Sequence, residues 1–247
     1  MSSEQHRGKP VTIPFLPALS GQAGVLDTGP ASMQVGLLDE HDAGRRAVEE
    51  FIHRSYASAY GADVRHFLPR LLVLHDAAEL RGALGFRRAR GNRLFLEKYL
   101  DISVEAALSL RAGRYVPRHG LVEVGNLVTA HAGGARWLIA ALTAYLKGAG
   151  YDWAVFTAVK ALRNAVARLG VELVTLAPAD PGRLAPEERA HWGSYYATEP
   201  MVVAASVHQS YDALQGKLLQ ADNDNRWLFL WREAFAAGAE GSAVPAG

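Results

Sequence analysis

The segment LVEVGNLV, residues 121–128, constrains the fold more than any other because it places a carboxylate and an amide inside an apolar run. Its β-branched and leucine positions predict a buried strand, in which an ionised Glu123 needs a partner or a raised pKa. Glu123 and Asn126 are three residues apart, so a regular strand would point them to opposite sides of a sheet. A β-bulge at Gly125 would turn both toward one side. We therefore expect a functional site on this strand.

A glycine-containing loop follows this strand and opens a helix. The loop leads into WLIAALTAYLKGAG, residues 137–150, whose apolar residues recur at helical spacing. The first backbone N–H groups of a helix are free, and the helix dipole favours a phosphate there. These groups belong to Gly133, Gly134 and Ala135, and Arg136 adds a positive charge. An equally open interpretation is a tight strand-to-helix turn that uses glycine only for its geometry.

Hydrophobic periodicity predicts the other elements. Strands are expected at residues 33–39, 71–74, 80–86, 153–159, 171–179 and 200–207, and helices at 42–60, 94–101, 102–110, 161–170 and within 210–237. Asp42 is expected to cap the first helix and Gly61 to end it. Gly148 and Gly150 are expected to end the helix that begins near residue 137.

The order of these elements predicts an α/β fold, a mixed central sheet flanked by helices. Its central connection is a parallel crossover, so that adjacent parallel strands carry Glu123 and Phe156. Residues 1–32 are rich in Pro, Gly and Ser and are expected to form a loose arm. Residues 33–207 are expected to form one domain, and residues 208–247 a C-terminal helical extension and tail.

Composition excludes several classes of function. The 26 Lys and Arg side chains against 25 Asp and Glu leave a net charge of +1, so we expect no nucleic-acid partner. There is no cysteine, and the nine histidines show no ligand spacing, so no metal site is expected. The start of the chain lacks an apolar secretory core and no run of about eighteen apolar residues occurs. We expect a cytoplasmic protein with no stable membrane span.

Five stretches carry a resemblance to a known family: LGFRRA (84–89), LFLEKYLD (94–101), VEVGNL (122–127), WAVFTAVKALRNAVARLG (153–170) and WGSYY (192–196). From about residue 35 to 207 the chain resembles the thermostable hemolysin family and, more broadly, the GNAT acyltransferase fold. The resemblance implies transfer of an acyl group, expected to be fatty, from a pantetheine thioester to a small amine acceptor. In GNAT enzymes the helix start binds the pyrophosphate of coenzyme A, and the central strands splay around the pantetheine arm.

Departures from the family patterns keep two donors open. His131, Gly134 and Arg136 occupy positions where GNAT enzymes have Arg or Gln, then Gly, then Gly or Ala, so only Gly134 matches. Acyl-CoA and an acyl carrier protein are therefore both expected as donors, the acyl-phosphopantetheine being a co-substrate and no cofactor being bound permanently. Acyl-homoserine-lactone synthases share this fold and use carrier-protein donors. Their catalytic strand has Glu, two residues and Arg, whereas here Glu123 is kept and Asn126 replaces the Arg.

The amine acceptor is mostly protonated at neutral pH, so a base must remove a proton before the amine attacks the thioester. Glu123 is the candidate base, because partial burial would raise its pKa toward the working pH. The alternative is a structural carboxylate paired with an arginine such as Arg87 or Arg136. Asn126 is expected to hold the acceptor or polarise the carbonyl, the alternative being an amide that satisfies backbone groups at a bulge.

The remaining predicted site residues divide into two groups. The donor is expected to contact Leu127, Val128, His131, Gly133, Gly134, Ala135, Arg136, Thr157 and Asn164. Glu97 and Asp101 lie four apart in a predicted helix, so both carboxylates would share one face and bind a cationic acceptor. A solvated face paired with Lys98 or Arg93 is the open alternative for these two. Tyr195 and Tyr196 are expected to be core or pocket wall.

Two alternatives to an acyltransferase remain open. One is a membrane-active protein, as the family label implies, for which the terminal segment RWLFLWREAF, residues 226–235, comes closest to a suitable amphipathic element. We expect that segment to cover the core or an acyl tunnel instead. The other is a non-catalytic GNAT-like binding module, which the unusual phosphate loop would suit.

Overall fold

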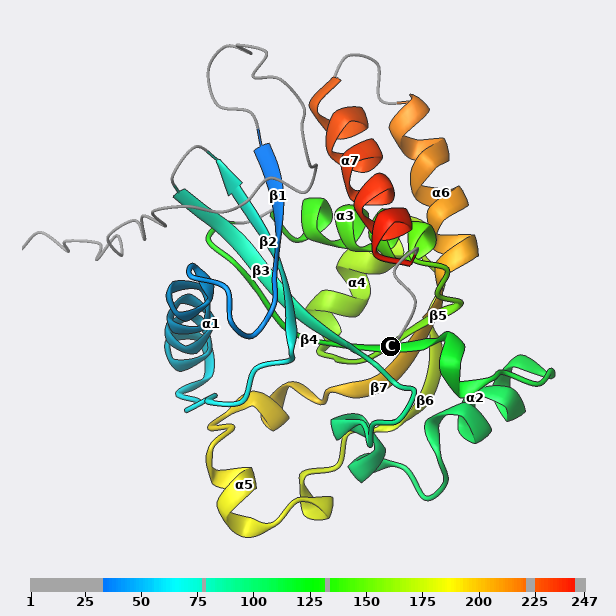
Figure 1. Cartoon of the computed structure of the whole chain (residues 1–247). Coiled ribbons are helices and arrows are strands. Elements are labelled where there is room, and N and C mark those ends of the chain that lie inside the picture. The colour runs from blue at the N-terminus through cyan, green and yellow to red at the C-terminus, as the bar shows by residue number, and fades with distance from the viewer. Residues whose placement is uncertain (1–32, 77–78, 132–133, 221–224, 243–247) are drawn as a thin grey trace, which may run out of the picture.

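The computed structural model describes residues 33–76, 79–131, 134–220 and 225–242. The predicted arm, residues 1–32, lies outside them. A single sheet of seven strands has the order β1-β2-β3-β4-β5-β7-β6, and β4 and β5 pair in parallel (Figure 1). The strands are β1 (Met33–Leu38), β2 (Arg70–Asp76), β3 (Glu79–Arg88), β4 (Leu121–Thr129), β5 (Trp153–Ala158), β6 (Val174–Pro178) and β7 (Met201–Ser206). The predicted mixed sheet and its parallel central pair are confirmed.

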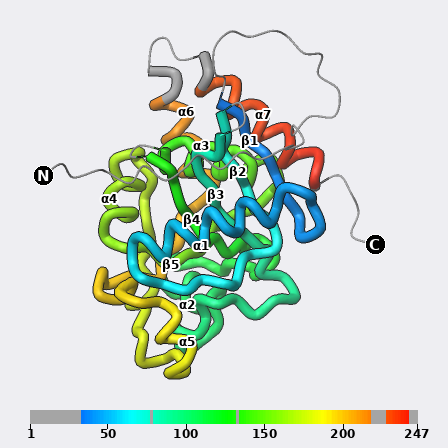
Figure 2. The backbone as a smooth tube through the Cα atoms, turned by 90° about the vertical axis from the view of Figure 1, so that its left-hand side faces the viewer, coloured from blue at the N-terminus to red at the C-terminus, as the bar shows by residue number. Residues whose placement is uncertain are grey.

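Helices cover both faces of this sheet. They are α1 (Arg45–Tyr60), α2 (Val104–Ala112), α3 (Gly134–Gly148), α4 (Lys160–Arg168), α5 (Pro186–Ala190), α6 (Val207–Gln220) and α7 (Asn225–Ser242), with 3-10 helices η1 (Phe95–Tyr99), η2 (Arg118–Gly120), η3 (Pro181–Arg183) and η4 (Tyr195–Thr198). One face packs against α3, α4, α6 and α7, and α1 lies across the other face in front of β3 and β4 (Figure 2). The sheet, including strand β4 with Glu123, is therefore the middle layer of a three-layer structure.

Two local predictions differ from the structure: the N-cap of the first helix and the helix expected at residues 94–101. The first helix begins at Arg45 with Gly44 as its N-cap, and Asp42 instead accepts a hydrogen bond from the backbone of Asp39. Gly61 ends that helix in a left-handed conformation, as predicted. The segment 94–101, predicted as a helix, forms only the short η1.

Strand β4 contains the predicted bulge, displaced by one residue. Val128 pairs with Ala83 and Gly125 with Gly85, so Leu84 alone faces both Asn126 and Leu127. Asn126, rather than Gly125, takes the left-handed conformation, with φ of 54°. The extra residue switches the faces of the strand: Val124 packs in the core under α3, whereas Val128 packs against α1. Glu123 and Asn126 therefore both reach one cavity.

The C-terminal helix α7 packs on α3. Trp227 stacks on Trp137 at 3.8 Å between ring centroids, and Trp231 is buried. A Cβ on Gly148 would lie 2.1 Å from the carbonyl oxygen of Phe235. A Cβ on Gly238 of α7 would meet the backbone of α3 at the same distance. The apolar helix α7 therefore covers the core, as expected. Gly148 allows the backbones of α3 and α7 to approach closely. Gly150 provides the left-handed residue after α3.

We expect Gly148→Ala to lower the free energy of unfolding by about 1–3 kcal/mol, because the new methyl group forces α3 and α7 apart. The control is Gly216→Ala in α6, where a Cβ meets no atom within 4 Å. This control should be neutral or stabilise by up to about 1 kcal/mol through helix propensity. Denaturant titration of both variants measures the difference, and equal effects would contradict the close crossing.

Candidate functional site

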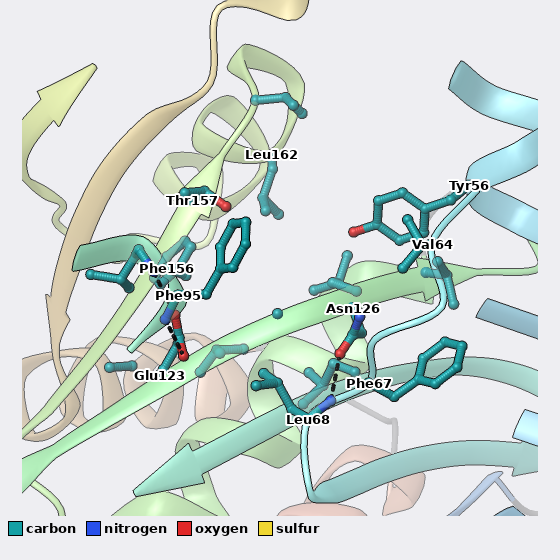
Figure 3. Close-up of a pocket in the computed structure, with 18 of the residues that line it drawn as sticks. Tyr56, Val64, Phe67, Leu68, Phe95, Glu123, Asn126, Phe156, Thr157 and Leu162 are labelled. Atoms are coloured by element: carbon teal, nitrogen blue, oxygen red, sulfur yellow. Dashed lines mark hydrogen bonds between the residues drawn. The ribbon is translucent and has the colours of Figure 1, made fainter. Parts of the chain in front are cut away.

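A cavity of about 860 Å³ opens where strands β4 and β5 separate. The two strands pair from Leu121 with Trp153 to Val124 with Phe156, and beyond this point β4 pairs with β3 and β5 with β7. The freed edge of β4, from Gly125 to Thr129, lines the cavity. Figure 3 shows the strands diverging, with Glu123 at the fork and Asn126 farther along β4. This fork confirms the splayed pair that the resemblance implied.

Glu123 is buried at the fork, with 4% of its surface exposed, and is bound by three donors. Arg87 Nε donates to Oε2 at 2.7 Å, and the backbone N–H groups of Phe95 and Leu96 donate to Oε2 and Oε1 at 3.2 and 2.9 Å. Arg87 lies directly opposite Glu123 in the β3–β4 register. The predicted pairing with Arg87 is thus the one formed, whereas Arg136 lies near the rings of Trp137 and Trp227.

Asn126 joins β4 to the segment between α1 and β2. Its Oδ1 accepts a hydrogen bond from the backbone N–H of Leu68 at 3.0 Å, and its Nδ2 donates to the carbonyl oxygen of His66 at 3.2 Å. The amide of Asn126, which lies at the bulge, therefore satisfies backbone groups of His66 and Leu68. This is the alternative that the sequence left open. A role of Asn126 toward a substrate stays a prediction.

The predicted donor-binding residues are only partly gathered at the cavity. Leu127, Val128 and Thr157 line it. Burial raises the pKa of Tyr195, and the neighbouring Thr157 side chain partly opposes this shift. Asn164 is exposed on α4 and is not among the lining residues, so the predicted contact with a pantetheine arm in this cavity is not supported.

At the start of α3, Gly134 is the first helical residue and Ala135 and Arg136 follow in the first turn. Gly133 lies outside the described residues. His131 Nε2 is 3.2 Å from Nη1 of Arg81, a cation on β3 that sequence reasoning missed. Arg81 also forms ion pairs with Asp76 and Glu79, so two carboxylates already offset its charge.

The helical face expected to carry both Glu97 and Asp101 is not formed, and their role in binding the acceptor stays a prediction. The segment is a 3-10 helix that ends at Tyr99, so the two carboxylates do not share a helical face. Glu97 accepts hydrogen bonds from Arg118 and from the backbone of Leu94 and Val104. Asp101 is exposed and pairs with Arg183. Neither carboxylate lines the cavity, and each is paired with an arginine.

An aromatic wall lies on the α1 side of the cavity; sequence reasoning correctly expected Tyr195 to be core or pocket wall but missed its other members. We define this wall as Tyr56, Tyr60, Phe95, Trp192 and Tyr195, which all line the cavity. Their ring centroids lie 5.1–6.4 Å apart in tilted and edge-on arrangements. Burial raises the pKa of Tyr56. The spacing of Tyr56 and Tyr60 by four residues in α1 was the available signal for part of this wall.

The opposite side of the cavity, toward α3, α4 and α6, is apolar. Its lining residues include Ile139, Leu142 and Leu146 of α3, Leu162 and Val166 of α4, and Val207 of α6. In the described part of the chain no three His, Asp or Glu side chains gather to hold a metal ion. Among the same residues, no helix is long and apolar enough to cross a membrane.

The seven-stranded sheet, the fork and the flanking helices define a GNAT-like acyltransferase fold. The chain belongs to the thermostable hemolysin family, whose model matches residues 38–211. No curated protein matches the sequence. Among solved structures, the AHL synthase LasI is 12% identical with a TM-score of 0.51, covering 75% of this chain and 96% of its own. FeeM, an N-acyl amino acid synthase from uncultured soil microbes, is 14% identical with the same TM-score of 0.51, covering 75% and 98%.

The Glu97 site generates a pH prediction. Burial alone would raise the pKa of Glu97, but hydrogen bonds from Arg118, Leu94 and Val104 outweigh it and lower the pKa from 4.5 to about 2. A lowered folded-state pKa stabilises the fold above about pH 4.5, and this contribution is lost as the pH falls toward about 2. We expect wild type to lose on the order of 2 kcal/mol more than Glu97→Gln across this window. Urea titrations at several pH values measure this, and parallel curves would contradict it.

Proposed function

We propose that this protein is an N-acyltransferase that moves a fatty acyl group from a pantetheine thioester to a small amine. The observation that carries the proposal is the cavity at the β4–β5 fork, with a buried carboxylate at its centre. The GNAT-like fold supports it, as do the activities of two proteins with similar structures, the AHL synthase LasI and the N-acyl amino acid synthase FeeM.

The cavity offers a different kind of surface to each part of the proposed donor. The pantetheine arm is a chain of amides, and the freed edge of β4, from Gly125 to Thr129, offers backbone groups that no longer pair with β5. The acyl chain lies on the apolar side, among Ile139, Leu142, Leu162 and Val166. The thioester carbonyl is then at the fork, beside Glu123.

Glu123 serves as the general base of the direct transfer. An acceptor ammonium gives one proton to Oε1, and the resulting amine attacks the thioester carbonyl carbon. The C–N bond forms, the C–S bond breaks, and the leaving thiolate takes the second amine proton. The products are an amide and a free thiol, and Glu123 returns its proton to water. No covalent acyl-enzyme is required, which agrees with the absence of cysteine from the chain.

The donor is acyl-CoA or an acyl carrier protein, and the start of α3 is the part of the chain that would distinguish them. Arg136 is the exposed cation in the first turn of α3. Thiol release with each donor, measured against a pooled amine library, tests the function. Release that depends on an acceptor supports the proposal. No release and no donor binding would favour the membrane-active or non-catalytic alternatives.

We expect Glu123→Gln to lower kcat by about 100-fold or more, because the amide cannot accept the ammonium proton. Donor binding should be retained. The matched control is Glu97→Gln, since Glu97 is also a shielded carboxylate that pairs with an arginine, but it lies outside the cavity. Both variants should lose stability, so thiol release is measured well below each Tm. Equal activity of the two variants would contradict a role of Glu123 in the reaction.

We expect Leu162→Trp to shorten the acyl chains that the protein accepts, because the larger side chain fills the apolar side of the cavity. Leu162 is partly buried and lines this side, so the added volume enters the cavity rather than the packed core. Rates with acyl donors of increasing length should fall at least about 10-fold for long chains and change little for short ones. Leu110→Trp, at an exposed position on α2, is the control and should keep the wild-type profile. An unchanged profile in Leu162→Trp would place the acyl chain elsewhere.

A further inference from the structure

Arg87 carries donors that the fold does not use. Its Nε donates to Glu123, and within the described residues its terminal Nη groups make no hydrogen bond to protein. The side chain is 24% exposed and lines the cavity beside the fork. An arginine presents five N–H donors in a planar fork, so most of this fork is available to a ligand.

The structural arginines of this protein behave differently. Arg118 binds two carboxylates and two backbone carbonyl groups through all three of its nitrogens. Arg45 likewise uses Nε, Nη1 and Nη2 on Glu49 and on the backbone of residues 68 and 69. An arginine that only held the fold together would be expected to use its fork in the same way. Arg87 instead lines the cavity with Nη groups that have no hydrogen-bond partner among the described residues.

Glu123 has an open hydrogen-bond acceptor position next to the unused donors of Arg87. A carboxylate offers about four lone-pair positions, and three are taken by Arg87, Phe95 and Leu96. Among the described residues, Oε1 accepts a hydrogen bond only from Leu96, so one position on Oε1 is open. The fork of the cavity thus presents one anionic acceptor next to unused cationic donors. Such a pair matches a ligand that carries an ammonium and a carboxylate on neighbouring atoms.

We propose that the acceptor is a free α-amino acid, whose ammonium binds Glu123 and whose carboxylate binds the Nη groups of Arg87. This proposal rests on the N-acyltransferase function proposed above. The product would be an N-acyl amino acid, formed with loss of the free thiol.

The aromatic wall adds a preference for the side chain of this amino acid. Phe95 links the two features, because its backbone N–H binds Glu123 while its ring packs 5.8 Å from Trp192. Tyr195 continues the wall from Trp192 at 5.1 Å. A side chain projecting from an amino acid held at the fork would meet these rings. We therefore infer an apolar or aromatic amino acid rather than an acidic one.

The test compares phenylalanine, phenylalaninamide and phenethylamine as acceptors, with lauroyl-CoA and the lauroyl carrier protein as donors. These acceptors share the ring and the amine, and only the first has a carboxylate. We expect wild type to favour phenylalanine in kcat/KM by about 10- to 100-fold over the other two, as a charge-assisted contact provides. Release with all three acceptors at equal kcat/KM would overturn the inference while leaving the proposed function standing. No release with any amine would overturn the function itself.

The Arg87→Lys variant, measured with the same three acceptors, is the second part of the test. Lysine keeps the charge beside Glu123 but loses the planar fork, so the preference for phenylalanine should fall toward one, mainly through a higher KM for phenylalanine. A purely structural role of Arg87 would lower the rates with all three acceptors equally and leave their ratio unchanged, which would overturn the inference. If Arg87→Lys fails to fold, the wild-type comparison of the three acceptors still decides it.

Discussion

The ion pair between Glu123 and Arg87 is the contact on which the site depends. It joins β4 to β3, and through the N–H groups of Phe95 and Leu96 it also fixes the start of η1. Removing one member of a buried pair leaves an unpaired charge, at a typical cost of about 3–5 kcal/mol. The pair therefore holds the aromatic wall against the sheet as well as supplying the charges at the fork. Arg87 lies directly opposite Glu123 on the neighbouring strand, so the two side chains meet across the β3–β4 pair.

The separation of β4 and β5 at the fork opens the ion pair of Glu123 and Arg87 to the cavity. If β4 and β5 continued to pair beyond Val124 and Phe156, the sheet would be closed and Glu123 would be a core carboxylate with no opening. The bulge at Asn126 removes that pairing and turns its amide toward the segment that follows α1. Asn126 tolerates the left-handed conformation better than most side chains, and its two hydrogen bonds offset the strain. One local irregularity thus opens the sheet and anchors a wall of the cavity.

The two sides of the cavity differ in chemistry because different helices cover the two faces of the sheet. Helices α3, α4 and α6 contribute aliphatic side chains, while α1, η1 and the segment around Trp192 contribute rings and hydroxyl groups. The Glu97, Arg118 and Glu105 cluster lies behind η1 and ties it to α2, so the aromatic side is held rigidly. The proposed acyl chain on the aliphatic side and the proposed amino acid on the aromatic side can meet at the fork.

By itself, the sequence determined most of the strands and helices and their order, because periodicity and turn residues are local signals. Strand β4, helix α3 and the parallel pair carrying Glu123 and Phe156 follow from such signals. A buried strand also singles out Glu123, and the bulge was predicted within one residue of Asn126. Tertiary structure alone decided the partners. The sequence predicted Glu97 as an acceptor ligand, whereas in the fold Arg118, twenty-one residues away, binds its carboxylate. In the aromatic wall, Tyr56 contacts Tyr195, which lies far away in the sequence. No local sequence pattern predicts such a contact, because it forms when distant segments pack together to bury apolar surface.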